Sequence, residues 1–261
     1  MRGWPNPLAP IGRVVLEFLA ATGRVALFTA EAVVAAVRPP YFLRQAGRQF
    51  LEIGYYSLPI VGLTAIFTGM VLALQSYTGF SRFAAESAIP SVLVVSLTRE
   101  LGPVLTALMV AGRVSASIAA ETGTMRVTDQ LDALVTLSAN PLQYLVAPRL
   151  LAGVLALPPL VLIADVIGTM GGFLISVGKL GFEPGIFLNR CLESLQTLDV
   201  VSGLVKAAVF GFLIVLMGSY HGFHSEGGAR GVGRATTNAV MSASALILVA
   251  NYLITEAFFS R

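Results

Sequence analysis

The sequence predicts an all-α integral membrane protein with five transmembrane helices, an N-terminal amphipathic helix in the interface, and a short cytoplasmic helix. Of its 261 residues 56% are hydrophobic and only 12% charged, whereas soluble domains carry about 25% charged residues. The mean hydropathy is +0.80, and five apolar stretches are long enough to span a bilayer. The net charge of +3 is small and scattered, so we expect no nucleic-acid partner. The single cysteine, Cys191, excludes an intrachain disulfide.

We assign residues 1–52 to an N-terminal interfacial and elbow region. Its first part carries charges spaced by four and seven residues, which form one narrow stripe on a helix: Arg13, Glu17, Arg24, Glu31 and Arg38. Such a helix is expected to lie in the interface; the alternative is a sixth span with its charges on a buried face. The charges also interrupt any signal-peptide core, so we expect this segment to be retained. Tyr41–Glu52 repeats the pattern and is expected to form an amphipathic elbow.

Residues 53–261 form the predicted five-span domain. The expected spans are Ile53–Gln75, Leu101–Ala120, Leu150–Val177, Val200–Tyr220 and Asn238–Phe259. Pro158 and Pro159 are expected to kink or break the third span. Eleven Lys and Arg residues flank the spans on the N-terminal side and four on the other, which predicts a cytoplasmic N-terminus.

Small residues four apart mark faces where helices can pack closely. They occur in the second, third and fourth spans: Gly112, Ala116 and Ala120; Gly168 and Gly172; Gly203, Ala207 and Gly211. We expect these faces to pack within one subunit, the alternative being a dimer interface.

Ionisable residues at Arg99, Glu100, Asp165 and Lys206 interrupt the apolar stretches. Such residues are costly in a membrane and suggest a functional site. Arg99 and Glu100 belong to the segment TRELGP, residues 98–103. The apolar run around this segment is too long for one crossing. We therefore expect the second span to begin at about Leu101, with both charges at its outer mouth and Gly-Pro in its first turn.

The second and fourth spans are expected to run inward from the outer side. Glu100 and Lys206 then lie at comparable depth, while Asp199 begins the fourth span. We predict that Glu100 and Lys206 face a common polar cavity in the outer half and form a pair. The alternative is that each side chain reaches the interface separately.

The connection between the second and third spans contains a predicted helix at about residues 126–140. Thr128 or Asp129 can cap its start, and Asn140-Pro141 is expected to end it. This helix is either an ordinary surface helix or a docking element for a cytoplasmic partner.

Two further motifs are incomplete matches to a phosphate-binding loop and to a metal site. In GGARGVGRATT, residues 227–237, Arg234-Ala235 replaces the Lys-Ser/Thr of a phosphate-binding loop, so we expect a flexible glycine-rich turn. His221, His224 and Glu226 lie close together, but they offer only three weak ligands in a glycine-rich loop. We expect no metal and no enzymatic activity.

Three segments resemble the MlaE permease family, the membrane subunits of phospholipid ABC transporters. They are TRELGPVLTALMVAGRVSASIAAETGTMRVTDQLDAL, NPLQYLVAPRLLAG and GGARGVGRATTNAVM. The resemblance implies a homodimer in the bacterial inner membrane and cytoplasmic ATPase subunits that use ATP and magnesium. It also implies a periplasmic MCE-domain protein, often a hexameric ring, and commonly a STAS-domain protein. The implied function is glycerophospholipid movement between the inner membrane and the periplasmic side, which maintains outer-membrane asymmetry.

The resemblance also implies roles for residues. Charged cavity positions fall on Arg48, Glu100, Asp199, Lys206 and Arg234, with Arg99 beside them. Lipid tails would contact Met70, Leu74 and Tyr77. The helix in the second connection would be the coupling helix that docks into the ATPase, with Arg126, Thr128, Asp129, Gln130 and Asp132 in or near it. No role carries over to Asp165.

Three other functions remain open from the residues alone. An ion-coupled secondary transporter would use Glu100 or Asp165 as a proton site and need no ATPase. An intramembrane enzyme would use His221 and His224. A scaffold without transport activity would give no reason for charged residues at the depth of the cavity.

Overall fold

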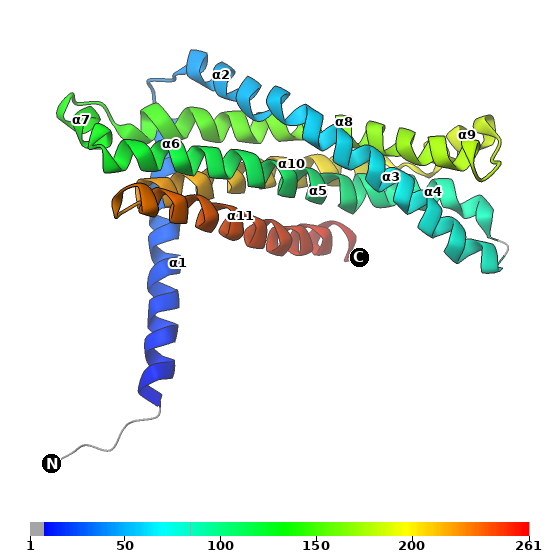
Figure 1. The fold of residues 1–261 in the computed structure, drawn as a ribbon, viewed down its shortest axis with the longest axis horizontal. Helices are drawn as coiled ribbons and strands as arrows, with labels where there is room; N and C mark the ends of the chain where they lie inside the picture. Colours follow the sequence, from blue (N-terminus) through cyan, green and yellow to red (C-terminus); the bar gives the residue numbers. More distant parts are fainter. Residues whose placement is uncertain (1–7, 84, 261) are drawn as a thin grey trace.

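The computed structural model describes residues 8–83 and 85–260 and is helical throughout the bundle. Five long helical segments run side by side along the longest axis of the molecule (Figure 1). Their elements are α3 (Leu58–Phe80), α4 (Ile89–Ser96) with α5 (Gly102–Val110) and α6 (Ala116–Val127), α8 (Ala147–Gly178), α10 (Thr197–Phe223) and α11 (Gly228–Phe259). These segments confirm the all-α membrane fold.

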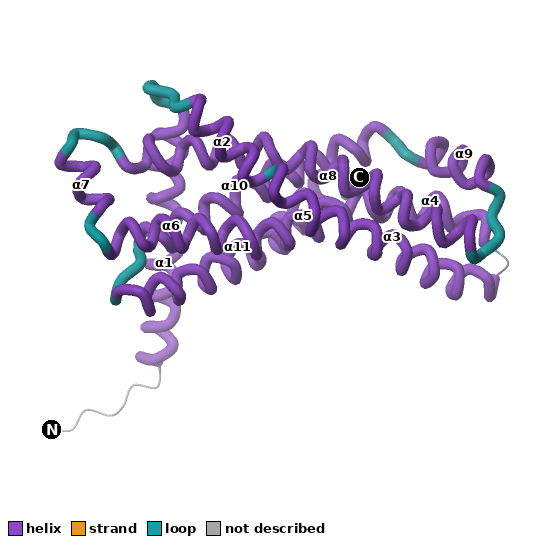
Figure 2. Tube along the Cα trace, turned by 45° about the horizontal axis from the view of Figure 1, so that its top comes forward, coloured by secondary structure: helices purple, strands orange, loops and turns teal. Residues whose placement is uncertain are grey.

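The N-terminal helix α1 (Leu8–Val37) runs across the bundle and not along it, in both Figure 1 and Figure 2. By length and composition alone, Val15–Val37 is a sixth candidate span. Its direction supports the interfacial position instead. Phe28 anchors α1 to α10, with its ring centroid 5.5 Å from that of Tyr220 and 5.7 Å from that of Phe223. The elbow helix α2 (Leu43–Ile53) follows, and a short 3-10 turn, Tyr55–Ser57, joins it to α3.

The second spanning segment begins much earlier than predicted. It runs from Glu86 to Val127, and TRELGP lies inside it rather than at its start. Two π-helical stretches, Leu97–Leu101 and Ala111–Ser115, join its three α-helical parts. A π-helical turn absorbs one extra residue, so the helix continues through Gly-Pro. Pro103 starts an α-helical part, but not the span.

The expected break of the third span and the expected flexible turn are both wrong. Helix α8 continues through Pro158 and Pro159 without ending, because groups on neighbouring helices of a bundle can satisfy the backbone carbonyls that prolines leave without donors. A kink at the two prolines stays a prediction. The glycine-rich segment after Gly227 is the first part of α11 and not a flexible turn. Only Gly227 and Gly228 have the positive φ angles, 86° and 66°, that make the turn.

Glycines let the helices approach to backbone contact. A Cβ atom on Gly69 of α3 would clash with the carbonyl of Gly168 on α8, and one on Gly203 of α10 would lie 2.7 Å from the carbonyl oxygen of Thr98. These positions confirm packing within one subunit for Gly168 and Gly203. The expectation is wrong for Gly112, which has nothing within 4 Å of a built Cβ. Its face of the helix is open in the single chain.

Short helices close the two ends of the bundle. Helix α7 (Gln130–Thr136) lies at the end where α6 finishes and α11 begins, and α9 (Pro184–Ser194) lies at the other end (Figure 1). We refer to these as the α7 end and the α9 end. A third π-helical stretch, Leu142–Val146, leads from the α7 end into α8.

Candidate functional site

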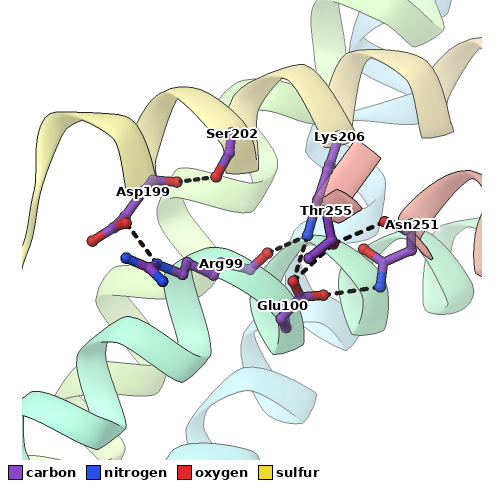
Figure 3. A network of polar contacts seen from close by, with 7 residues as sticks. All are labelled: Arg99, Glu100, Asp199, Ser202, Lys206, Asn251 and Thr255. Atoms are coloured by element: carbon purple, nitrogen blue, oxygen red, sulfur yellow. Dashed lines mark hydrogen bonds and ion pairs between the residues drawn. The ribbon is translucent and has the colours of Figure 1, made fainter. Parts of the chain in front are cut away.

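A network of charges lies inside the bundle where the first π-helical stretch meets α10 and α11 (Figure 3). Lys206 Nζ donates to Glu100 Oε1 at 2.8 Å. Asn251 Nδ2 donates to Glu100 Oε2 at 2.9 Å, and the Thr255 hydroxyl donates to Oε1 at 2.9 Å. The predicted pairing of Glu100 with Lys206 is confirmed. Both oxygens of the carboxylate are satisfied by partners from two other helices.

The missing N–H of Pro103 explains a second hydrogen bond of Lys206. Pro103 has no backbone N–H, so the carbonyl of Arg99, four residues earlier, lacks its α-helical donor. Lys206 Nζ donates to this carbonyl oxygen at 2.7 Å. One ammonium group therefore neutralises Glu100 and satisfies a backbone acceptor that the proline leaves free. This explains how a completely buried lysine is accommodated among apolar helices.

The other half of the network joins Arg99 to the start of α10. Arg99 Nε donates to Asp199 Oδ1 at 2.6 Å, and its guanidinium lies 4.3 Å from the centroid of the Phe259 ring. Asp199 is fully buried, and its Oδ2 accepts the backbone N–H of Gln196 at 3.0 Å in a capping box. Asp199 therefore holds Arg99 and the first turn of α10 together.

Only part of the network is accessible. Lys206 and Asp199 are 0% exposed, whereas the side chains of Arg99 and Glu100 are 32% and 38% exposed. Lys206 is thus enclosed by protein and does not face an open cavity with Glu100, contrary to that part of the prediction. The accessible part of the network is a guanidinium, whose Nη groups donate no hydrogen bond to the residues that the structure describes, beside a carboxylate. Two opposite charges in an apolar bundle suit a polar group attached to an apolar body.

Three members of the network were not predicted: Asn251, Thr255 and Phe259. All three lie on α11 and are four residues apart, which places them on one face of the helix. This spacing, with polar residues in an apolar stretch, is the signal that was available in the sequence. The partner helix could not be identified from it.

The other predicted cavity residues lie apart from the network. Arg48 lines a separate cavity at the α7 end. Arg234 is exposed near the start of α11, 17 residues before Asn251, or about 25 Å along the helix. Met70, Leu74 and Tyr77 are half-buried on α3, and no hydrogen bond joins Tyr77 to the network within the described ranges. The structure thus brings together Arg99, Glu100, Asp199 and Lys206 only.

The predicted coupling segment contains a helix shorter than expected, α7, from Gln130 to Thr136. Asp129 precedes it with a left-handed φ of 57° and makes no side-chain capping bond. Arg126 Nη1 donates to Asp132 Oδ1 at 2.8 Å, so an exposed ion pair links the end of α6 to α7. The Thr128 hydroxyl, just past the end of α6, donates to the carbonyl of Thr124 in its last turn.

Asp165 and the two histidines have no hydrogen bond to the charged network among the described residues. Asp165 is buried on α8 against Gly102, and its Oδ1 has no hydrogen-bond partner among the described residues. His221 Nε2 lies 2.9 Å from the Ser242 hydroxyl, and His224 Nδ1 lies 2.8 Å from the Tyr220 carbonyl oxygen. Within residues 8–83 and 85–260, no group of His, Cys, Asp and Glu residues is arranged to hold a metal.

Comparisons with known proteins agree with this architecture. Residues 46–257 match the family described as Permease MlaE. A "Probable ABC transporter permease protein" of Rickettsia felis is 57% identical over 95% of this chain and 96% of its own length. The "Intermembrane phospholipid transport system permease protein MlaE" of Haemophilus influenzae is 32% identical over 97% and 98%. "Protein TRIGALACTOSYLDIACYLGLYCEROL 1, chloroplastic" of Arabidopsis thaliana is 34% identical over 90% of this chain and 67% of its own length.

The match reaches all five bundle segments and includes the four charged residues of the network, and these two relatives align over almost the whole chain. The chain therefore belongs to the MlaE family of ABC transporter permeases.

Proposed function

We propose that this permease moves glycerophospholipid between the bacterial inner membrane and the periplasmic side, and so maintains outer-membrane lipid asymmetry. The observation that supports this proposal most is that the side chains of Arg99 and Glu100 are accessible, although they belong to a charged network inside an apolar bundle. A phospholipid has a charged headgroup and apolar tails, so it matches this combination. The printed name of the Haemophilus influenzae relative supports the same substrate class.

In this proposal the α7 end faces the cytoplasm. The functional unit is a homodimer with two ATPase subunits, which bind ATP and magnesium, and a periplasmic MCE-domain ring, with a STAS-domain subunit in some complexes. Helix α7 docks into the ATPase. Because the segment Glu86–Val127 is one continuous spanning unit, movement of α7 is transmitted through α6 to Arg99 and Glu100. ATP-driven closure then changes the network and releases the headgroup.

Reconstitution tests the function directly. Proteoliposomes that contain the chain with its copurified ATPase are expected to transfer a fluorescent phospholipid to an acceptor only with ATP and magnesium. The control is a Walker-lysine variant of the ATPase, which should be inactive. Transfer by the chain alone, driven by a proton gradient, would instead establish an ion-coupled secondary transporter.

The docking role of α7 leads to a second prediction. Leu137 follows α7 and is 77% exposed, so nothing in the single chain explains its apolar side chain. Leu137→Glu is expected to reduce ATPase copurification at least tenfold, because the new carboxylate would be buried without a partner in the complex. The melting temperature of the isolated chain should not change, because the same carboxylate is exposed to solvent there. The matched control is Leu192→Glu on α9, where the leucine is 73% exposed at the opposite end. Equal ATPase recovery with both variants would contradict the docking role.

A further inference from the structure

Arg149 joins the two helices that α7 connects. It lies in the first turn of α8, and its side chain is 4% exposed. Its Nη2 lies 2.7 Å from Glu121 Oε2, and its Nη1 donates to the Thr122 hydroxyl at 3.0 Å. Glu121 and Thr122 both belong to α6. We call these three side chains the α6–α8 bridge.

The bridge lies at the base of the connection that contains α7. Helix α6 ends at Val127 and α8 begins at Ala147, and α7 lies at the far end of the molecule beyond them (Figure 1). The guanidinium is planar and uses two of its nitrogens for two acceptors, so it fixes the orientation of the helices as well as their spacing. The ends of α6 and α8 are therefore joined rigidly.

Thr122 connects the bridge to a third helix. It is 1% exposed, and a Cβ built on Gly222 of α10 would lie 2.7 Å from the Thr122 Cβ. The bridge is thus part of the closely packed interior at this end of the bundle. Because Arg149 is withdrawn from water there, its charge depends on the Glu121 carboxylate, and the pair cannot be opened without cost.

Helix α7 itself has few contacts with the bundle. Of residues 130–136, all of which the structure describes, only Leu131 is buried. The ion pair of Arg126 with Asp132 is exposed on both sides, and exposed pairs contribute little. A force that acts on α7 therefore reaches the bundle mainly through the two ends of the connection, which the bridge joins.

We propose that Arg149 is a positioning residue that makes α6 and α8 move together when α7 is displaced, an inference that rests on the proposed docking of α7 into an ATPase. With the bridge intact, displacement of α7 moves α6 and, through the continuous segment Glu86–Val127, also Arg99 and Glu100. Without the bridge, the ends of α6 and α8 separate, and the displacement is absorbed in the connection. ATP is then hydrolysed with little lipid transfer.

A distance measurement on the chain alone tests the bridge without an ATPase or a lipid. The only cysteine of the sequence is removed by Cys191→Ser, and spin labels are attached through Val135→Cys on α7 and Leu155→Cys on α8. These two side chains are 59% and 63% exposed, so labels fit there. Double electron–electron resonance in detergent should give one narrow distance distribution. Arg149→Met is expected to broaden it to at least about twice that width, because the connection can then open locally.

The matched control for this variant is Arg190→Met on α9. Arg190 also lies near a glutamate, with its Nη1 3.9 Å from Glu193 Oε2, but it is 55% exposed and lies at the opposite end of the bundle. It should leave the distance distribution unchanged. A distribution as narrow with Arg149→Met as with Arg190→Met would overturn the bridge.

Glu121→Gln keeps the test decisive if Arg149→Met fails to fold. The Glu121 side chain is 58% exposed, so the interior packing is kept while the ion pair is lost. The distribution should broaden in the same direction but less, because the bond from Arg149 to Thr122 remains. An unchanged width with Glu121→Gln would count against the bridge.

The coupling role is measured in proteoliposomes as the amount of fluorescent phospholipid transferred per ATP hydrolysed. Arg149→Met is expected to lower this ratio at least about fivefold, the lower end of usual coupling factors. ATPase recovery on copurification should stay unchanged, because the exposed surface of α7 is intact. A purely structural role would reduce the amount of folded complex but not the ratio.

An unchanged ratio, or a parallel loss of ATPase recovery, would overturn the positioning role of Arg149. If the parent complex transfers no phospholipid at all, the proposed function fails. The distance measurement then still decides whether the bridge joins α6 and α8, so the two failures are distinguishable.

Discussion

Lys206→Met is expected to destabilise the protein by about 3 kcal/mol and to abolish lipid transfer. Removing one partner of a buried ion pair costs about 3–5 kcal/mol, because the remaining charge is left without compensation. Lys206 is 0% exposed, but the Glu100 side chain is 38% exposed, so water offsets part of this cost. The variant also leaves the carbonyl of Arg99 without its donor. Thermal unfolding in detergent and ATP-driven transfer measure the two effects.

The control for this variant is the only other lysine of the sequence, Lys179, which is exposed at the end of α8. Lys179→Met should leave both measurements unchanged. The double variant Glu100→Gln/Lys206→Met should recover at least about 1 kcal/mol of the stability, because the uncompensated charge is gone. A double variant as unstable as Lys206→Met alone would show that the lysine contributes packing and not charge pairing.

Gly69→Ala is expected to destabilise the bundle by about 2–3 kcal/mol or more. The added Cβ would clash with the backbone carbonyl of Gly168, which cannot move as a side chain can, so α3 and α8 must separate. Overpacking of this kind typically costs about 1–3 kcal/mol. The melting temperature in detergent measures the loss.

Gly79→Ala is the matched control on the same helix. Nothing lies within 4 Å of a Cβ built on Gly79, so the change is expected to be neutral or to stabilise α3 by up to about 1 kcal/mol. If Gly69→Ala were as well tolerated as Gly79→Ala, the close contact of α3 with α8 would be wrong.

The charged site was partly predictable because isolated charges in apolar stretches are conspicuous. Glu100 and Lys206 could be paired from the depth that the span directions give them, and the ion pair is present. Their role in lipid binding stays a prediction. Asn251 and Thr255 escaped notice, because neutral polar residues in a spanning helix are common and the sequence does not say which helix they face.

The predicted start of the second span was wrong for a different reason. Counting apolar residues assumes a uniform α-helical rise, and on that assumption Gly102-Pro103 looks like a helix start. The π-helical stretch Leu97–Leu101 changes the local rise and rotation, and Lys206 replaces the hydrogen bond that Pro103 cannot make. The donor comes from a residue more than 100 positions later, which no local pattern can reveal.

Composition and hydropathy by themselves determined that this chain is a helical membrane protein, and its motifs determined the permease family, because both signals are local along the sequence. The tertiary structure alone decided which charges meet: Arg99 meets Asp199 and Glu100 meets Lys206, whereas Arg48 lies in a separate cavity at the α7 end. The physical reason is that a buried charge is stabilised by whichever opposite charge the helix packing brings within a few ångströms. That packing depends on glycine contacts between helices far apart in the sequence.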